Sequence, residues 1–463
     1  MAHGNLDGAS GTGTSGVSRR NALLRGGAVA AGLGTTAVGV ATVGPWSSDG
    51  SGGQGVVDVR EHGARGDGRS DDTAPLQRAI DAAGRAGGIV FFPPGTYLTG
   101  RLTLRSRVHL RGSGGDATIL RLRAGANSAI LESDGFSRLA GTRSDQGITL
   151  FSVRDLTLDG NKEQNPSAGY GLRVYGYGYE ISEVIVFNCR NDGVVSEWGP
   201  AGALPAPSHQ MEARLSAVRT HGNDGHGINF HGPHDSMFIN CLTFENGASG
   251  FRLAGDSMGT SMVNCHAWGI KQNISFDLAA TGISCSNCYA DLNGGVGVRI
   301  SRNDIRWIGG LVLGYNHTDP HPEIGIQFVP GVQPEEPSGC LVESKVVNCG
   351  TAAVDFGAER GLSSVRVSLS QPGAVDADGR RIPGTGRGWI GTPAPTTLVE
   401  ITQGLGHPDK NLVVRPAFDL RAEAEPARPG DGSVRVFARD VGGRTQLCAL
   451  FPSGAVQVLA TEP

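Results

Sequence analysis

Apolar and polar residues alternate in short runs along the middle of the chain, and the runs return at a nearly constant interval. The signature Asn-x-x-x-Gly-apolar-x-apolar occurs at Asn223–Phe230, Asn246–Leu253 and Asn293–Ile300, with Ile274 and Phe276 in phase between them. Alternation with a period of two predicts half-buried β-strands, and its return about every 23 residues predicts repeated coils. Because one coil cannot bury its apolar face alone, neighbouring coils must stack to form the core. The pattern predicts an all-β protein, a parallel β-helix.

Asparagine–cysteine pairs repeat at a similar interval. From Cys241 to Cys265 is 24 residues and from Cys265 to Cys288 is 23, and the 52 residues from Cys189 to Cys241 are interpreted as two coils with a small insertion. The cysteines in this context are Cys189, Cys241, Cys265, Cys288 and Cys349. A small apolar residue that recurs once per coil predicts a buried stack of thiols rather than a disulfide framework. The pair Cys285 and Cys288 leaves a redox or metal site open.

A helical segment precedes the repeats. In "DDTAPLQRAIDAAGRAGG" the N-cap is Asp72 or Thr73, and Gly87-Gly88 end the helix. The face that the helix would bury consists of Leu76, Ile80 and Ala83. Because an open solenoid end exposes strand edges, we expect this helix to cap the first coil. The adjacent carboxylates Asp71 and Asp72 are interpreted as helix-capping groups and not as a catalytic pair.

Residues 1–50 have the composition of a targeting signal. Arg19-Arg20 stand before a Gly/Ala-rich, weakly apolar run from Ala22 to Val43. This arrangement predicts twin-arginine export and an extracellular protein. A single membrane helix is the alternative, but the many glycines make the run a poor lipid anchor. We expect no membrane span in the mature chain.

The last residues change character again. A link "EPARPGDG" leads to three alternating runs with turns at Gly442-Gly443 and Ser453-Gly454. We therefore predict a β-helix over residues 51–400 and a small C-terminal β-module over residues 401–463. Such a module suits capping, self-association or surface attachment, so a homo-oligomer stays open.

Charge limits the class of partner. The formal net charge is −4 and stays modestly negative without residues 1–50. A chain of this charge has no general attraction to nucleic acid or to anionic lipid. Nucleic acid is therefore not an expected partner.

Three stretches resemble a known family. The stretch His62–Tyr97 resembles the opening of pectate-lyase-superfamily domains of the rhamnogalacturonase and epimerase type. The stretches "DLTLDGNKEQN" (Asp155–Asn165) and Asn223–Phe251 are similar to the catalytic module of secreted mannuronan C5-epimerases. The resemblance covers Val56 to Asp256 and implies a right-handed parallel β-helix that binds a polysaccharide.

The phase of the alternation sorts residues into core and outer face. In "INFH", Ile228 and Phe230 point inward, so Asn229 and His231 point outward. One coil, two coils and three coils beyond Asn229, the repeat places Arg252, Ser275 and Arg299. For His231 the corresponding residues are Ala254, Asp277 and Ser301.

One outer face is therefore predicted to carry His231, Arg252, Asp277 and Arg299 as a connected strip. Coils stack at about 4.8 Å, so the two arginines would lie roughly 10 Å apart. Guanidinium groups at that separation would hold alternate carboxylates of a polyuronate. The alternative is a salt-bridged solvent face.

Catalytic candidates come from this face and its neighbours. They are Glu197, His226, His231, Asp277, Asp192 and Asp224. His234 and Asp235 are interpreted as turn residues. His226, His231 and His234 lie at different corners of the coil, so no metal site is predicted. No cofactor is expected, and calcium stays open.

The resemblance implies a departure in the site. The stretch Gly225–Gly227 resembles polygalacturonases, but the paired aspartates expected one coil earlier are missing. The epimerases carry a Tyr-x-x-Asp-Pro-His element, and Asp192 and Glu197 stand in the approximate places of its tyrosine and histidine. The catalytic triplet is not preserved. The stretch Tyr315–Glu323 echoes its composition and is interpreted as a loop.

Aromatic residues suggest where a sugar would bind. Trp198 follows Glu197, and Tyr170, Tyr175, Tyr177 and Tyr179 lie upstream. Aromatic faces pack on pyranose rings, although strand propensity alone also accounts for tyrosines in strands. The predicted substrate-binding residues are Arg252, Arg299, Asn229, Trp198, Tyr175 and Tyr177.

These residues favour a secreted lyase of an acidic, uronate-containing glycan. Arg252 and Arg299 would neutralise the uronate carboxylate, His231 or His226 would remove the C5 proton, and Glu197 or a tyrosine would protonate the leaving oxygen. Epimerisation or hydrolysis in the same groove are the alternatives, hydrolysis with two of Asp192, Glu197, Asp224 and Asp277. A glycan-binding or adhesive β-helix without turnover is the alternative from another class.

Overall fold

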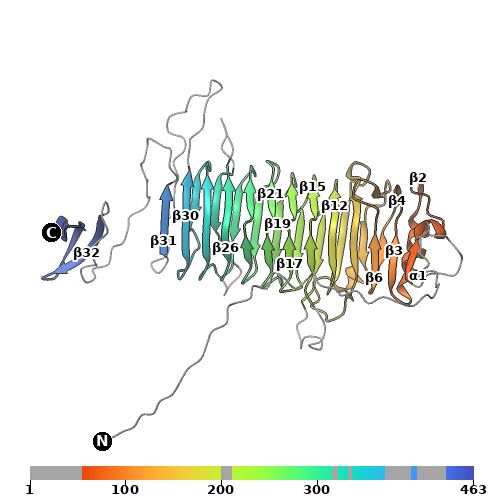
Figure 1. Ribbon diagram of the computed structural model, residues 1–463, viewed down its shortest axis with the longest axis horizontal. Helices are drawn as coiled ribbons and strands as arrows, with labels where there is room; N and C mark the ends of the chain where they lie inside the picture. The colour runs from red at the N-terminus through yellow and green to blue at the C-terminus, as the bar shows by residue number, and fades with distance from the viewer. Residues whose placement is uncertain are drawn as a thin grey trace, which may run out of the picture. The chain divides into compact units, whose positions relative to one another are not determined.

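The chain folds into stacked coils whose strands form two long parallel sheets (Figure 1). The computed structural model describes residues 55–199, 211–314, 322–331, 336–370, 398–403 and 434–462. The predicted fold class is confirmed: a right-handed parallel β-helix with an N-terminal helix and a C-terminal antiparallel sheet. No helix in the described ranges is long and apolar enough to cross a membrane.

The first sheet takes one or two strands from each coil. Long strands on the outer coils pair with two short strands on the central coils; β12, for example, pairs with both β14 and β15. The strands are β1 (Val56–Asp58), β2 (Asp67–Asp71), β3 (Gly88–Phe91), β4 (Gly95–Thr99), β6 (Val108–Arg111), β7 (Thr118–Leu122), β10 (Ser152–Asp159), β12 (Glu180–Phe187), β14 (Arg214–Ser216), β15 (Arg219–His221), β17 (Met237–Ile239), β18 (Leu242–Phe244), β20 (Ser261–Val263), β21 (His266–Trp268), β23 (Ser284–Ser286), β24 (Tyr289–Asp291), β26 (Arg306–Leu313), β28 (Leu341–Val347), β30 (Ser364–Ser370) and β31 (Leu398–Gln403).

The second sheet takes one strand from each coil and carries the candidate site. Its strands are β5 (Leu102–Leu104), β8 (Ala129–Ser133), β11 (Tyr170–Tyr177), β13 (Val194–Glu197), β16 (Ile228–His231), β19 (Ser249–Ala254), β22 (Ile274–Ala279), β25 (Val296–Ile300), β27 (Ile324–Phe328) and β29 (Ala352–Asp355), with β9 (Ile148–Thr149) beside β11. Parallel pairing in register lines up inward residues such as Ile228, Phe251, Phe276 and Val298. All four are fully buried, and the rings of Phe251 and Phe276 stack at 5.0 Å. The predicted stacking of apolar positions from coil to coil is confirmed.

Two bends in each coil require a left-handed backbone, and asparagine often supplies it. Asn240, Asn264 and Asn287 adopt φ values of 54°, 52° and 51° between the two short strands of the first sheet. Asparagine tolerates this conformation better than most residues. Each is followed by a buried cysteine, and all eight cysteines of the chain are buried and free. The predicted stack of thiols is confirmed for Cys241, Cys265 and Cys288, whose side chains interact with one another.

The prediction that Cys189 and Cys349 belong to the same stack is wrong. Asn188 and Asn348 follow the long strands β12 and β28, at the bend between the first and the second sheet. Asn188 and Asn348 have φ values of 59° and 54°, like the asparagines of the first bend, so the same dipeptide suits either bend. The 52-residue spacing from Cys189 to Cys241 therefore joins two different bends.

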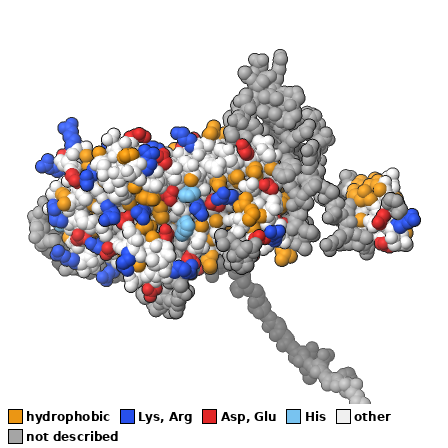
Figure 2. Space-filling model, turned by 180° about the vertical axis from the view of Figure 1, so that it is seen from behind, with side chains coloured by type: hydrophobic (Ala, Val, Ile, Leu, Met, Phe, Trp, Pro, Cys, Tyr) orange, Lys and Arg blue, Asp and Glu red, His pale blue; other side chains and the backbone are white. Residues whose placement is uncertain are grey.

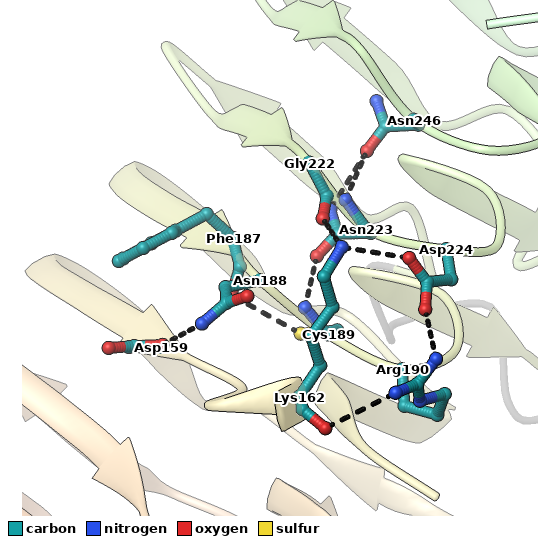
Figure 3. A network of polar contacts seen from close by, with 10 residues as sticks. All are labelled: Asp159, Lys162, Phe187, Asn188, Cys189, Arg190, Gly222, Asn223, Asp224 and Asn246. Atoms are coloured by element: carbon teal, nitrogen blue, oxygen red, sulfur yellow. Dashed lines mark hydrogen bonds and ion pairs between the residues drawn. The ribbon is translucent and has the colours of Figure 1, made fainter. Parts of the chain in front are cut away.

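An amide ladder fills this second bend (Figure 3). The backbone N–H of Cys189 donates to Oδ1 of Asn223 at 3.0 Å, and Nδ2 of Asn223 donates to Oδ1 of Asn246 at 2.9 Å. Nδ2 of Asn246 in turn donates to Oε1 of Gln272 at 3.1 Å. The repeated asparagine of the sequence signature is thus a buried structural group. It pairs polar atoms that stacking would otherwise leave unsatisfied.

The helix α1 (Thr73–Gly84) packs against β3 and β5 and buries Leu76, Ala79, Ile80 and Ala83. Asp72 is the N-cap residue, but its carboxylate accepts backbone N–H groups of Arg65 and Gly66. The carboxylate of Asp71 accepts the N–H of Thr73 at 3.0 Å. The two aspartates thus have local structural contacts, and the helix ends one turn before the predicted Gly87-Gly88.

Three short helical segments lie in the connections. They are η1 (Val59–His62), α2 (Phe136–Leu139) and η2 (Lys162–Gln164). The segment α2 begins the connection between β8 and β9 that reaches the candidate site. Its Phe136 and Leu139 pack with Tyr175 and Trp198.

The C-terminal strands form a separate antiparallel sheet of β32 (Arg435–Val441), β33 (Arg444–Leu450) and β34 (Val456–Thr461). The predicted turn at Gly442-Gly443 has positive φ at both glycines. Phe437, Cys448 and Leu450 form its small buried cluster. The predicted boundary at residue 400 falls inside the strand β31, which pairs with β30 of the first sheet. The domain limits stay predictions.

Two earlier predictions fall outside the described residues. The export signal concerns residues 1–50, and most of the Tyr315–Glu323 stretch lies in the undescribed range 315–321.

Candidate functional site

The outer face of the second sheet carries a column of mostly polar residues, one per coil. We call it the outer column. In register it contains Glu132, Arg173, Val195, Asn229, Arg252, Asp277, Arg299, Gln327 and Asp355. Since neighbouring parallel strands are about 4.8 Å apart, this column brings residues distant in sequence into contact. The predicted strip of Arg252, Asp277 and Arg299 lies within it.

One register assignment made from the sequence is wrong. Ser275 was expected opposite Arg252, whereas Arg252 faces Asp277 and Ser275 is fully buried. The coil that enters β22 is two residues longer than the coil that enters β19, so a constant repeat misplaces this strand. Asp277 therefore lies between the two arginines and not in line with His231.

The two arginines of this strip are ion-paired to the aspartate between them. Arg299 donates from Nε and Nη2 to the two oxygens of Asp277 at 2.9 and 2.7 Å, and Nε of Arg252 lies 3.5 Å from Oδ2. The Asp277 side chain is only 2% exposed, while those of Arg252 and Arg299 are 36% and 34% exposed. These contacts agree with the alternative of a salt-bridged solvent face. Two arginines and one aspartate still leave the group with a net positive charge that faces solvent.

A second group of the same composition lies upstream on the same sheet. Glu132 is paired with Arg101 and with Arg173, both at 3.2 Å, and its side chain is 8% exposed. The Arg173 guanidinium also lies over the rings of Phe136 and Tyr170. We call these two groups, each a buried carboxylate between two arginines, the arginine clamps.

A hollow of about 140 Å³ lies on the coils between the arginine clamps, at residues that stand two positions further along β13 and β16 than the outer column. It is lined by Gly141, Arg143, Tyr175, Glu197, Trp198, Gly199, His231, Gly255 and Asp256. Glu197 and His231 face each other directly in the register of β13 and β16. Figure 2 shows histidine side chains on one face of the coils, among side chains of both charges. Two of the predicted catalytic residues are thus brought together.

Hydrogen bonds fix the groups around His231. Nε2 of His231 lies 2.8 Å from Oδ1 of Asn229, and Nδ2 of Asn229 donates to Oδ2 of Asp192 at 2.9 Å. The other oxygen of Asp192 accepts the backbone N–H of His226 at 2.7 Å. Asp192 thus lies behind His231, and it is absent from the lining of the hollow.

The other predicted residues lie elsewhere. Asp224 is paired with Lys162 at 2.8 Å and with Arg190 at 2.7 Å (Figure 3). Nδ1 of His226 accepts the backbone N–H of Ser249 at 3.1 Å. Neither these two residues nor Asp277 lines the hollow, so their contacts support structural roles.

The aromatic residues do not form the open platform that the sequence suggested. Tyr175 and Tyr179 are almost fully buried, and their hydroxyls bond Ser144 and Ser196. Trp198 is 1% exposed and packs on Tyr177 at 4.5 Å. Apolar packing under the connection from β8 to β9 removes these ring faces from solvent. Tyr175 and Trp198 contribute only to the wall of the hollow.

Arg143 and Asp256 were missed by sequence reasoning. They line the hollow and form an ion pair with contacts of 3.0 and 3.4 Å. Asp256 follows the end of β19 one coil beyond His231, so the repeat offered a signal for it. Arg143 lies in the non-repeating connection after α2, and no periodic pattern could place it.

Burial tunes the histidines of the site. Burial, followed by the positive charge of Arg252, lowers the pKa of His231 below its ordinary value. Burial is also the main cause that lowers the pKa of His226. Both side chains are therefore neutral at pH 7, and a neutral imidazole can accept a proton. Burial raises the pKa of Tyr175, which keeps its hydroxyl protonated.

The described residues contain no group of three or more His, Cys, Asp or Glu side chains placed to hold a metal ion. His234 is bonded to its neighbour Asp235 at 2.8 Å, in the turn that follows β16. His226, His231 and His234 thus have three separate sets of hydrogen-bond partners.

Comparisons with known proteins agree with this architecture. Residues 56–284 match the family described as rhamnogalacturonase A/epimerase, pectate lyase-like. The mannuronan C5-epimerase AlgE2 of Azotobacter vinelandii is 29% identical over 225 residues, which are 42% of this chain and 22% of that protein. Alginate lyase 7 of the same organism is 28% identical over 218 residues, 43% of this chain and 23% of that protein. The resemblance to the pectate-lyase superfamily and to the epimerases is confirmed.

A solved structure shows the same fold. The A-module of the mannuronan C-5 epimerase AlgE6 of Azotobacter vinelandii superimposes with a TM-score of 0.54 and 21% identity, over 76% of this chain and all of that module. The chain spans less than a quarter of the length of the two curated relatives described above.

Proposed function

We propose, on the premise that residues 56–284 form a pectate-lyase-like module, that the protein is an extracellular enzyme acting on an acidic, uronate-containing polysaccharide. The polysaccharide would lie along the outer column of the second sheet. The observation that carries the proposal is that Glu197 and His231 are neighbours in strand register and line one hollow. The two arginine clamps lie on the coils to either side of it. The names of the relatives, which include epimerases and an alginate lyase, support the same substrate class.

The leading reaction is β-elimination, for which the site offers a base, an acid and positive charge. His231, neutral and half-buried, accepts the C5 proton of a uronate residue, and the electrons of that bond form the C4–C5 double bond. The glycosidic oxygen on C4 leaves and takes a proton from Glu197. Positive charge from Arg143 and Arg252 stabilises the negative charge that develops on the uronate carboxylate.

Two further reactions use the same hollow. If the proton returned to the opposite face of C5 before the oxygen left, the reaction would be epimerisation, which the relatives' names favour. Hydrolysis is favoured by a different observation, the presence of two carboxylates, Glu197 and Asp256, in the lining. Of the four carboxylates considered for hydrolysis from the sequence, only Glu197 lines the hollow.

Assays of the full-length protein with polymannuronate, polyguluronate and polygalacturonate separate these reactions. Elimination gives absorbance of an unsaturated uronate, hydrolysis gives reducing ends without it, and epimerisation changes the C5 configuration in the NMR spectrum of the polymer. We expect unsaturated product, with a loss of at least about 100-fold in kcat for His231→Gln and for Glu197→Gln.

The control for this assay is His234→Gln, since His234 lies in a turn outside the hollow lining. It should keep full activity. Binding of the polymers without any product would overturn the enzymatic proposal in favour of a glycan-binding β-helix. Full activity in His231→Gln would show that the site is misplaced.

Export by the twin-arginine route remains part of the proposal, on the strength of Arg19-Arg20 and the run that follows. A homo-oligomer and calcium dependence are alternatives that the sequence leaves open.

A further inference from the structure

We propose that Asn229 and Asp192 are positioning residues that hold the His231 ring as the Nε2–H tautomer, with the lone pair of Nδ1 directed to the hollow. The inference rests on the proposed function for its catalytic meaning. The tautomer itself follows from contacts in the free protein and can be measured without substrate.

The direction of the hydrogen bonds is set by the carboxylate. An ionised carboxylate only accepts hydrogen bonds, so the group of Asn229 that faces Asp192 at 2.9 Å must be its NH₂. The carbonyl oxygen of Asn229 then faces Nε2 of His231 at 2.8 Å. A carbonyl oxygen only accepts, so Nε2 must carry the hydrogen. Nδ1 of a neutral imidazole with this tautomer is an acceptor.

The carboxylate that starts this chain is itself held in place. Its Oδ1 accepts the backbone N–H of His226 at 2.7 Å, and a Cβ placed on Gly225 would lie 2.2 Å from the same oxygen. The absence of a side chain at Gly225 therefore lets the backbone approach Asp192. The chain Asp192–Asn229–His231 is thus anchored to the loop that enters β16.

Nδ1 of His231 lies at the hollow. A Cβ placed on Gly255, which lines the hollow, would be only 3.3 Å from Nδ1. No described group forms a hydrogen bond with Nδ1. Its lone pair is available to a ligand that enters beside Gly255.

The neighbouring histidine provides the contrast. Nδ1 of His226 accepts the N–H of Ser249 at 3.1 Å, so its acceptor nitrogen is already occupied by backbone. Both histidines were candidates for the base. The hydrogen bonds assign the proton acceptor to His231 and leave His226 only the Nε2–H as a donor.

This arrangement prepares His231 for the proposed reaction. When Nδ1 takes a proton, the ring becomes a cation whose Nε2–H remains bonded to Asn229, with the Asp192 carboxylate behind it. A wrong tautomer would present an N–H to the substrate instead of a lone pair, and such an error is costly in enzymes that use a histidine base.

The test is NMR of the full-length protein with ¹⁵N-labelled histidine rings, at a pH above the titration of His231. Ring nitrogen shifts distinguish the two tautomers, and spectra of His231→Gln and His226→Gln assign the signals among the 12 histidines. We expect His231 as Nε2–H in the unaltered protein. Asn229→Leu should convert it to a mixture of tautomers, while His226 stays unchanged as the internal control.

Asn229→Asp separates positioning from simple packing. One oxygen of the new carboxyl group still accepts from Nε2–H, so the tautomer should persist. The other oxygen replaces Nδ2 and faces the Asp192 carboxylate, so the two carboxyl groups should share one proton. A wild-type ring with hydrogen on Nδ1, or an unchanged tautomer in Asn229→Leu, would overturn the inference.

Kinetics gives an independent reading if the enzyme is active. Asn229→Leu should lower kcat by about 100-fold with little change in KM, and Asn229→Asp should retain more activity because it keeps the acceptor for Nε2–H. The Nε2–H tautomer observed in an inactive protein would refute the proposed function and leave the positioning inference intact.

Discussion

At the scale of single residues, the repeated asparagine has a structural function. Side-chain hydrogen bonds link Asn223 to Asn246 and Asn246 to Gln272 inside the second bend, where all three residues are buried. The sequence signature revealed their spacing, and their fully buried state is what makes them costly to replace. The same reasoning separates them from Asn229, whose amide faces outward to the candidate site.

Replacing Asn246 should therefore destabilise the fold. In Asn246→Leu, Oε1 of Gln272 loses its partner, and Nδ2 of Asn223 keeps only a 3.5 Å contact with the carbonyl oxygen of Val186. Leaving buried polar groups unpaired costs about 1–3 kcal/mol. The free energy of unfolding measured by urea titration should fall by that amount. Asn273→Ala, at an exposed asparagine nearby, is the matched control and should change it little. Equal stability of both variants would contradict a structural role for the ladder.

At the scale of elements, the first sheet carries an external stack of rings. Phe187, His221, Phe244 and Trp268 occupy one register position on consecutive coils, with ring centroids 5.2, 4.5 and 4.7 Å apart. The rings are nearly parallel and half-buried. The sequence repeat contains these positions, but only the register shows that they touch.

The stack makes stability depend on pH. Burial, and then the charge of Arg219, lower the pKa of His221. The unfolded chain therefore binds a proton more readily, so stability is retained above the ordinary histidine pKa of about 6.5 and is lost as the pH falls below it. His226 and His231 shift in the same direction.

His221→Phe should keep the stack and remove one of these protons. We expect a smaller loss of the free energy of unfolding between pH 7 and pH 5, measured by urea titration at each pH. An unaltered pH dependence in His221→Phe would exclude His221 as a contributor.

At the scale of the whole molecule, the accessibility of the buried thiols indicates whether the solenoid is folded. Burial raises the pKa of Cys340 to about 11 and that of Cys349 to about 12, and the other cysteines are buried as well. Side-chain hydrogen bonds with Cys265 and Cys285 lower the pKa of Cys288, but its sulfur is buried like the others. Reaction needs a thiolate that the reagent can reach, so we expect these groups to be inert in the folded state.

A maleimide should consequently label none of the seven solenoid thiols in the native protein at pH 7. Mass spectrometry after urea unfolding should find them labelled together, since neighbouring coils share one core. Cys448 lies in the C-terminal sheet and is counted separately. Rapid native labelling of Cys285 or Cys288, or a disulfide between them, would restore the redox alternative.

The amino-acid sequence by itself determined the coiled architecture. A stacked solenoid satisfies three features of the sequence. These are strict alternation, bend residues such as Asn264, and a set of apolar residues that one coil cannot bury. It also placed His231, Arg252, Asp277 and Arg299 on one outer face, because alternation fixes which side of a strand each residue occupies.

The tertiary structure decided what those residues contact. Coils differ in length, so a constant repeat placed Ser275 where Asp277 lies, and it assigned Cys189 to the wrong bend. Arg143 reaches the hollow from a connection that follows no period. Tyr175 and Trp198 are buried, so they line the wall of the hollow and do not form an open binding platform. Local alternation fixes the side of a strand, whereas register and packing between coils depend on loops whose lengths carry no periodic signal.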